Sequence, residues 1–139
     1  MIRPTPVKFI GAMSSTLPLD LPDRLREFQQ LLDQCQCTMA DPGAERATVA
    51  KQVDELGDFI QHHFLSVTME DWPCQGPQPW SSIQTELQRT LRLLSTELIF
   101  WRSARSPQRQ HHYQQRLLGH YQQLADFSKA MQQWVDGAD

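Results

Sequence analysis

The sequence lacks the common motifs of catalysis and of metal or phosphate binding. It contains no Glu-x-x-His motif, no glycine-rich phosphate loop and no pair of carboxylates that stands out as an acid–base couple. Helical bundles often bind metals through Glu-x-x-His motifs on facing helices, so this absence argues against a metal-dependent enzyme. We therefore expect a non-enzymatic protein with no metal and no other cofactor.

The five histidines do not replace the missing motif. His62 and His63 are adjacent, so on a helix they point about 100° apart and cannot share one ion. His112 and His120 lie on one helical face, but Arg116 between them would repel a cation. We expect His63 to be a histidine at the edge of the core, with a hydrogen-bond partner.

Cysteine is also scarce. The chain has three cysteines, and Cys35 and Cys37 are too close together for a usual structural disulfide. Cys35 falls on an apolar helical stripe, where a thiol packs inertly, whereas Cys37 faces outward and Cys74 lies in a proline-rich loop. The pattern predicts reduced thiols and a cytoplasmic protein.

A strong positive charge and a long apolar run are both missing. The net charge of −3 argues against nucleic-acid binding, which requires a basic domain. The apolar run from Val7 to Met13 is interrupted by Lys8 and is shorter than the roughly 20 residues of a membrane span. We expect no nucleic-acid or membrane partner, and we interpret residues 1–16 as a flexible N-terminal arm.

The sequence does contain a helical repeat of apolar residues, which make up 40% of the chain. They recur at alternating intervals of three and four, a spacing that keeps one stripe of each helix facing its neighbours. Four such stripes occur: Leu21–Met39, Val49–Val67, Ile83–Trp101 and Tyr113–Val135. They predict an all-α fold, an antiparallel (up-down) four-helix bundle in which residues 17–139 form a single domain.

The predicted helix boundaries agree with these stripes. Asp41-Pro42 and Ser106-Pro107 each place a capping side chain before a proline, which the first turn of a helix tolerates. Ser81-Ser-Ile-Gln84 matches a capping box. The connection between the second and third helices, around residues 68–80, is long and contains prolines and tryptophans, and we expect it to fold back onto the bundle.

Charge is distributed unevenly between the two predicted hairpins. Residues 20–71 contain eleven acidic and four basic residues, a net charge of −7, whereas residues 83–120 contain six basic and two acidic residues, a net charge of +4. One interpretation is that the hairpins attract each other within the bundle and that the remaining charges are solvated.

The other interpretation is functional, because arginines gather around the Ser106-Pro107 break. A guanidinium group can bind a carboxylate through two parallel hydrogen bonds. An acidic surface on another protein therefore fits this region better than a nucleic acid does. The candidate partner-binding residues are Arg102, Arg105, Arg109, His112 and Arg116.

The third predicted helix is more apolar than one core contact requires. A helical wheel places Leu93 and Phe100 on one side of its core stripe and Ile99 on the other. A bundle helix can bury a wide face, so we expect Leu93 and Phe100 in the core, whereas Ile99 is harder to bury with them. If either flank is exposed, these residues mark a homodimer seam or a partner site.

A family resemblance covers residues 87–131. It is carried by three runs and by a later set of positions: Leu91-Arg92-Leu93-Leu94, Glu97-Leu98-Ile99-Phe100, Ala104-Arg105, then Arg116-Leu117, Leu124 and Phe127 to Met131. In these positions the chain resembles the cyanobacterial heterocyst frequency control protein PatD family. The resemblance implies a small cytoplasmic, non-enzymatic regulator that modulates the tubulin-like division protein FtsZ and, where heterocysts occur, their frequency.

Two alternatives remain open at this stage. An assembly or chaperone-like factor for a photosynthetic or other complex would use the same apolar flanks. A metal protein or enzyme would instead use the core of the bundle, and the missing Glu-x-x-His motif weighs against it.

Overall fold

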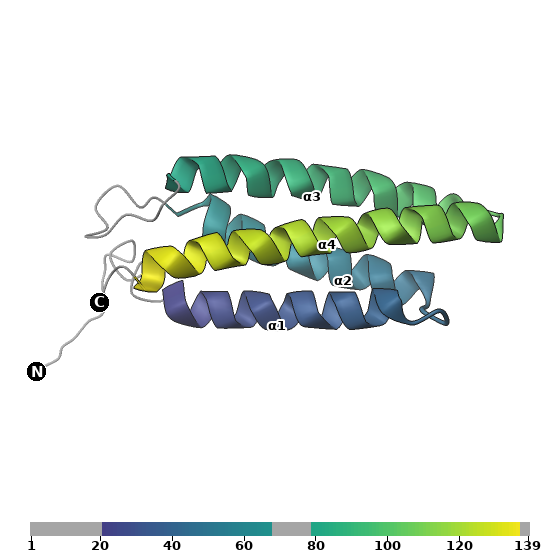
Figure 1. Cartoon of the computed structure of the whole chain (residues 1–139), viewed down its shortest axis with the longest axis horizontal. Helices are drawn as coiled ribbons and strands as arrows, with labels where there is room; N and C mark the ends of the chain where they lie inside the picture. Colours follow the sequence, from purple (N-terminus) through teal and green to yellow (C-terminus); the bar gives the residue numbers. More distant parts are fainter. Residues whose placement is uncertain (1–20, 68–78, 137–139) are drawn as a thin grey trace, which may run out of the picture.

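Four α-helices and one π-helical turn account for nearly all of residues 21–67 and 79–136, which are the residues that this computed structural model describes (Figure 1). The prediction of an all-α, four-helix fold is confirmed for this part of the chain. The expected N-terminal arm at 1–16, Trp72 and Cys74 lie outside the described residues. The elements are α1 (Leu21–Ala40), α2 (Arg46–Ile60), η3 (Gln61–Leu65), α3 (Trp80–Ser103) and α4 (Pro107–Asp136).

Contacts between side chains fix the direction of α3 against α4. Near the start of α3, Trp80 packs edge-on against Trp134, close to the end of α4, with ring centroids 5.8 Å apart. Near the end of α3, Phe100 stacks on Tyr113 in the second turn of α4 at 5.4 Å. The two helices therefore run in opposite directions along their whole contact, as Figure 1 also shows.

The same reasoning applies to α1 and α2. Gln52 in the first half of α2 donates from Nε2 to the Thr38 hydroxyl near the end of α1, at 3.0 Å. Phe59, close to the end of α2, stacks parallel to Phe28 in the first half of α1. These helices also run in opposite directions, and α4 closes the bundle by packing against α1 as well as α3.

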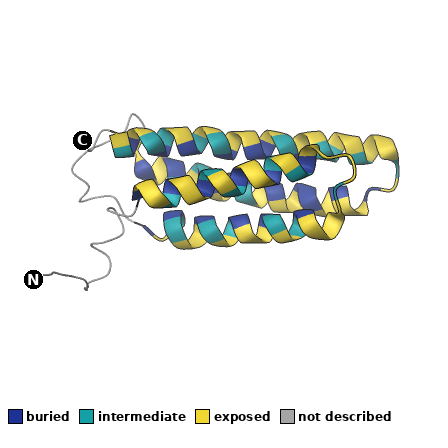
Figure 2. Cartoon of the chain, turned by 90° about the horizontal axis from the view of Figure 1, so that it is seen from below, coloured by how far each residue is buried: buried dark blue, intermediate teal, exposed yellow. Residues whose placement is uncertain are grey.

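Each helix buries one stripe, and its other residues are half-buried or exposed (Figure 2). Burying a large aliphatic or aromatic side chain contributes about 1.5–3 kcal/mol, so these stripes supply the main driving force for folding. The buried positions keep the predicted three-and-four spacing, which confirms the stripes. In α1 they are Leu21, Leu25, Phe28, Leu32, Cys35 and Met39, and in α2 they are Val49, Val53, Leu56 and Ile60.

One of the two helix starts that were predicted at a proline is wrong. Asp41 accepts a hydrogen bond on Oδ1 from the Gly43 amide at 2.9 Å and so closes a tight turn, and α2 begins only at Arg46. Asp before Pro-Gly favours such a turn because its carboxylate binds the amide two residues ahead. The other prediction is confirmed, because Ser106 Oγ accepts from the Arg109 amide at 3.1 Å and α4 begins at Pro107.

The predicted capping box at the start of α3 is also wrong. Helix α3 begins at Trp80, and the Gln84 amide turns away from that end. Its Nε2 donates to the carbonyl oxygens of Phe64 at 2.9 Å and Val67 at 2.6 Å. Gln84 therefore satisfies carbonyl groups at the end of the preceding helical segment, which otherwise have no partner within that segment. Carbonyl groups of a neighbouring segment therefore compete successfully with the start of α3 for the Gln84 side chain.

The α3–α4 hairpin is longer than the α1–α2 hairpin and projects beyond it (Figure 1). Gln114 donates to the carbonyl oxygen of Met39, close to the last residue of α1, at 2.5 Å. Residues 107–113, at the start of α4, consequently lie past the end of α1. We refer to residues 99–113 as the hairpin end.

Candidate partner-binding surface

Three of the predicted arginines lie at the hairpin end and are exposed. Arg102 is in the last turn of α3, Arg105 is in the connection, and Arg109 is in the first turn of α4. Within residues 21–67 and 79–136, no ion pair joins any of the three to an acidic side chain. Their guanidinium groups are therefore available to carboxylates of another molecule.

The backbone at the hairpin end is held by an arginine from another helix. Arg46, the first residue of α2, donates from Nη1 to the Arg102 carbonyl at 2.5 Å and from Nη2 to the Ala104 carbonyl at 3.2 Å. A cation is favoured here because the carbonyl groups at a helix C-terminus carry partial negative charge. Arg46 thus fixes the backbone from which Arg102 and Arg105 extend.

Arg116 differs from the other predicted arginines because it is already paired. Its Nε donates to both carboxylate oxygens of Glu97, at 2.5 and 2.6 Å, although 52% of the Arg116 side chain remains exposed. His112 is exposed and packs edge-on against the Tyr113 ring at 5.0 Å. Arg116 and His112 therefore lie on α4 beside the hairpin-end arginines, but with intramolecular contacts of their own.

Glu97 is a buried acid that no motif in the sequence marks as a site residue. Only 7% of its side chain is exposed, and His120 Nε2 lies 3.1 Å from Oε1. Burial acts to raise the pKa of Glu97, but hydrogen bonds with His120 and Arg116 outweigh it and hold the pKa below its usual value. The sequence signal was an acid one residue before a core leucine, on the side that faces the next helix.

Three large apolar side chains of α3 are exposed: Leu93 by 39%, Ile99 by 64% and Phe100 by 47%. The expectation that Leu93 and Phe100 belong to the core is wrong. Glu97 lies between them on the same side of α3 and occupies the contact with α4, so the apolar positions one turn away on each side remain partly in solvent. The stacking of Phe100 on Tyr113 covers only part of that ring.

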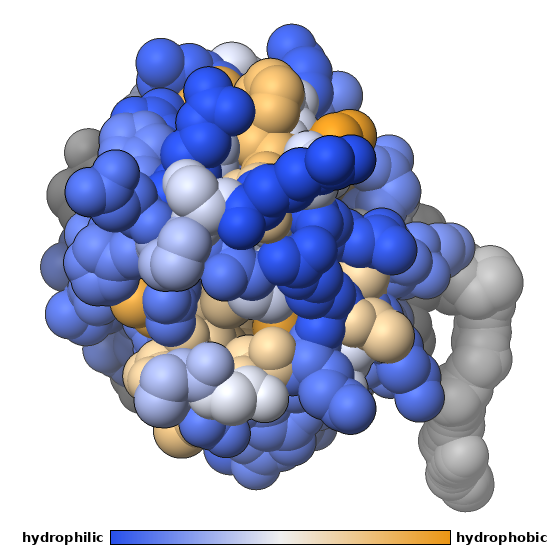
Figure 3. All heavy atoms as spheres, turned by 90° about the vertical axis from the view of Figure 1, so that its right-hand side faces the viewer, coloured by the Kyte–Doolittle hydropathy of each residue, from blue (hydrophilic) through white to orange (hydrophobic). Residues whose placement is uncertain are grey.

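Ile99 does not lie beside Leu93 and Phe100. At about 100° per residue, Ile99 points well away from both side chains. Arg102 follows Ile99 by three residues, a spacing that places both on neighbouring parts of the same face of α3. Figure 3 looks onto the end of the bundle where this hairpin projects, and strongly hydrophilic side chains lie across it with small hydrophobic areas between them.

Direct pairing between the acidic and basic hairpins does not occur in the described ranges. The surface pairs join Arg24 to Glu27, Arg26 to Asp23 and Arg89 to Glu86, and the Glu97 cluster joins α3 to α4. Each of these ion pairs stays within one hairpin. The arginines of the hairpin end therefore form no ion pairs with the described acidic residues of α1 and α2.

The predicted positions of Cys35 and Cys37 are confirmed. Cys35 is buried and Cys37 is exposed. Burial raises the pKa of the Cys35 thiol to about 11, and Tyr121 and Glu55 have smaller effects. Within residues 21–67 and 79–136, no three His, Cys, Asp or Glu side chains come together to form a metal site.

His63 lies at the edge of the core as expected, but its ring makes no hydrogen bond with a described residue, contrary to the other part of the prediction. Its ring packs against the Phe59 ring with centroids 4.5 Å apart, and its side chain is partly buried. Burial and the charge of Arg24 lower the pKa of His63. This environment is that of a packing residue.

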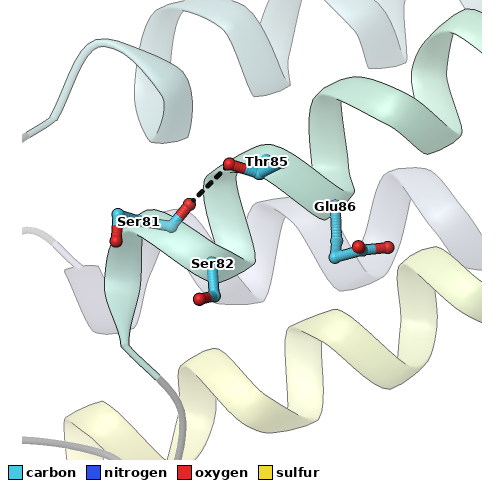
Figure 4. Close-up of a pocket in the computed structure, with 4 residues that line it drawn as sticks. All are labelled: Ser81, Ser82, Thr85 and Glu86. Carbon is cyan, nitrogen blue, oxygen red and sulfur yellow. Dashed lines mark hydrogen bonds between the residues drawn. The ribbon is translucent and has the colours of Figure 1, made fainter.

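The described residues form hollows at both the start of α3 and the middle of α4. One, of about 290 Å³, is lined by Ser81, Ser82, Thr85 and Glu86 at the start of α3 (Figure 4). The Thr85 hydroxyl in it donates to the Ser81 carbonyl at 2.9 Å. This hollow lies at the opposite end of α3 from the hairpin end and contains no arginine, so it does not contribute to the predicted surface.

The second hollow, of about 270 Å³, lies on α4 beside the Glu97 cluster. Arg116, Gly119, His120 and Gln123 line it. It is shallow and open, and two of its lining residues contact the buried Glu97 carboxylate. The hollow therefore extends the arginine-bearing surface along α4, away from the hairpin end.

Among the described helices, none has an apolar stretch long enough to cross a membrane. Comparison of the chain with protein-family models, curated proteins and solved structures finds no match.

Proposed function

We propose that this protein is a cytoplasmic, non-enzymatic regulator that acts by binding another protein through its hairpin end. The observation that carries the proposal is the presence there of three exposed arginines, Arg102, Arg105 and Arg109, without an acidic partner in the described ranges. The same segment, residues 99–113, also carries the exposed side chains of Ile99 and Phe100. Arginine and aromatic residues are enriched at the energetic centres of protein interfaces.

The proposed partner is FtsZ, through the resemblance of residues 87–131 to the PatD family. Two features of the hairpin end support a protein partner of this kind. It projects beyond the α1–α2 hairpin, so another protein can approach it from several sides. The connection between α3 and α4 is held by Arg46 and by the Ser106 cap, so this part of the hairpin end is ordered before binding.

The test is direct binding of purified FtsZ from the same organism, followed by fluorescence anisotropy. The wild-type protein is compared with the triple variant Arg102→Glu, Arg105→Glu, Arg109→Glu. The matched control is Lys51→Glu, Arg92→Glu, Lys129→Glu, which makes the same change in charge at exposed positions outside the hairpin end. We expect FtsZ to bind the wild type and the control, and the hairpin-end variant to bind at least about tenfold more weakly.

Equal binding of FtsZ by all three proteins would show that the contact lies elsewhere on the protein. Failure of the wild type to bind FtsZ would contradict the division role and favour the alternative of an assembly factor for another complex. Light scattering at two concentrations separates both results from a homodimer whose seam contains Leu93, Ile99 and Phe100. Circular dichroism of each variant confirms that the helical fold is intact.

A further inference from the structure

We propose that the partner contributes an acidic amphipathic helix, which lies along the seam between α3 and α4. This inference rests on the proposed function and names the element that the hairpin end recognises. The seam is formed by Leu93 and Phe100 of α3 and by Arg109, Arg116 and Gly119 of α4. It runs from the hairpin end to the hollow on α4.

The register of the two helices brings these residues into one row. Phe100 stacks on Tyr113, and one turn earlier in α3, Glu97 contacts Arg116 and His120. Because the helices run in opposite directions, Leu93, one turn before Glu97, lies opposite the turn of α4 that follows Arg116. The hollow is on this part of α4 and is lined by residues of α4. The seam therefore offers an apolar side chain at each end of a polar centre.

The charge of the seam selects an acidic occupant. Arg109 and Arg116 are seven residues apart, so they lie on the same face of α4 with a rise of roughly 10 Å between them. Arg116 is held by Glu97 through its Nε, which leaves its two terminal nitrogens without a contact among the described residues. Carboxylates spaced seven residues apart on a partner helix match these two guanidinium groups.

The hollow supplies space for an apolar side chain of the partner. A Cβ atom placed on Gly119 meets nothing within 4 Å, so the absence of a side chain there leaves the hollow on α4 open. A leucine or phenylalanine of the partner can fill it and cover the exposed part of Leu93. Apolar anchors inside a ring of charged contacts are the usual arrangement of helices bound in grooves.

A helix suits this seam better than an extended segment does. The described part of the chain contains no strand, so it has no sheet edge to which a peptide could add. The partner must therefore satisfy its own backbone hydrogen bonds when it is covered, and a helix does so internally. An amphipathic helix also presents apolar and acidic residues on adjacent faces.

The probe is a fluorescein-labelled synthetic helix of about 20 residues, which spans about 30 Å and carries leucines on one face flanked by glutamates seven residues apart. Its binding to the full chain is measured by anisotropy for the wild type, Gly119→Leu and Gly57→Leu. Both glycines are helical and a Cβ on either meets nothing within 4 Å, so a side chain can begin at either position without a clash, and leucine favours the helix over glycine. Gly57 lies on α2, away from the seam.

We expect the acidic helix to bind the wild type and Gly57→Leu alike, and Gly119→Leu about tenfold or more weakly because leucine fills the hollow. A peptide with lysine in place of every glutamate is expected not to bind. Equal affinity for Gly119→Leu and wild type, or equal binding of the lysine peptide, overturns the inference. Absence of binding by the acidic helix overturns it as well, and binding of FtsZ to the wild type would then leave the proposed function intact.

Discussion

Glu97 places a carboxylate inside the contact between α3 and α4, where a charge is tolerated only with partners. Arg116 and His120 supply them, and together they replace the apolar contact that the spacing of Leu93 and Phe100 predicts. The sequence indicated which side of α3 is apolar, but not that one acid on that side would take the inward position. That choice depends on Arg116 and His120 of a different helix, which no local pattern in α3 reveals.

The first prediction concerns the stability that this cluster provides. Replacing Glu97 by glutamine removes the charge that holds Arg116 while keeping the size of the side chain. We expect a loss of about 2 kcal/mol in the free energy of unfolding at neutral pH, since a buried charged hydrogen bond is lost but Arg116 can still reach water. Chemical denaturation measures it, and Glu86→Gln, which breaks only the surface pair with Arg89, should cost less than about 0.5 kcal/mol.

The same cluster gives a pH dependence of known sign. The pKa of Glu97 is lower in the folded protein than its usual 4.5. Its contribution to stability is therefore complete above that pH and is lost as the pH falls through the folded value. The difference in stability between wild type and Glu97→Gln should be constant near neutral pH and shrink under acid conditions below 4.5. A difference that grows as the pH falls would contradict this assignment.

The second prediction concerns thiol reactivity. Cys35 is buried with a pKa raised to about 11, whereas Cys37 is exposed. In a Cys74→Ser background, iodoacetamide at mildly alkaline pH should label the folded protein at Cys37 alone, because Cys35 is neither accessible nor ionised. Labelling at both positions is expected once the protein is unfolded. Mass spectrometry of tryptic peptides distinguishes the two cysteines.

At the scale of the helices, apolar spacing predicted the core side chains well because burial of one stripe depends on the helical repeat alone. The boundaries were less predictable. Asp41-Pro42 closes a turn that ends before Arg46, and Gln84 bonds to carbonyls of another segment instead of capping its own helix. In both places a local motif had a competing use, and only the position of the neighbouring backbone decides between them. The π-helical turn at Gln61–Leu65 had no signal in the pattern of apolar residues.

The third prediction tests the contact between the start of α2 and the end of α3. Arg46→Ala removes two hydrogen bonds to the carbonyls of Arg102 and Ala104. We expect a loss of about 1 kcal/mol in the free energy of unfolding, because the contact is charged but partly in solvent. Lys51→Ala, on the same helix, is the control and should change stability little. An unchanged stability of Arg46→Ala would mean that water replaces the guanidinium group without cost.

At the scale of the whole molecule, the two hairpins keep their charges apart. The described ion pairs do not cross from the acidic α1–α2 hairpin to the basic region of α3 and α4. The sequence showed this charge asymmetry but allowed two interpretations, attraction between the hairpins or a partner-binding surface. A count of charges does not show which side chains form ion pairs. The sequence predicted that the arginines and Ile99 belong to the candidate surface. The hollow at Gly119 could not be predicted, because its lining comes together only in the folded structure.

The fourth prediction concerns the salt dependence of FtsZ binding, and it assumes the proposed function. Raising the ionic strength from about 0.01 M to about 0.15 M shortens the Debye length from about 30 Å to about 8 Å. Because the hairpin-end arginines are exposed, we expect association with FtsZ to slow markedly while dissociation changes little. Biolayer interferometry at several salt concentrations separates the two rates. Salt-independent association would assign the binding energy to apolar contacts instead.

The projection of the α3–α4 hairpin beyond α1 has a consequence for local unfolding. Residues 107–113 lack the α1 neighbour that covers the rest of α4. Segments with fewer buried contacts open at a lower free energy than the middle of a domain, so their amide protons exchange sooner with solvent. This terminus of α4 can therefore fray and close again while the central turns stay protected. When a ligand binds the hairpin end, deuterium uptake should decrease more in residues 107–113 than in the central turns of α4.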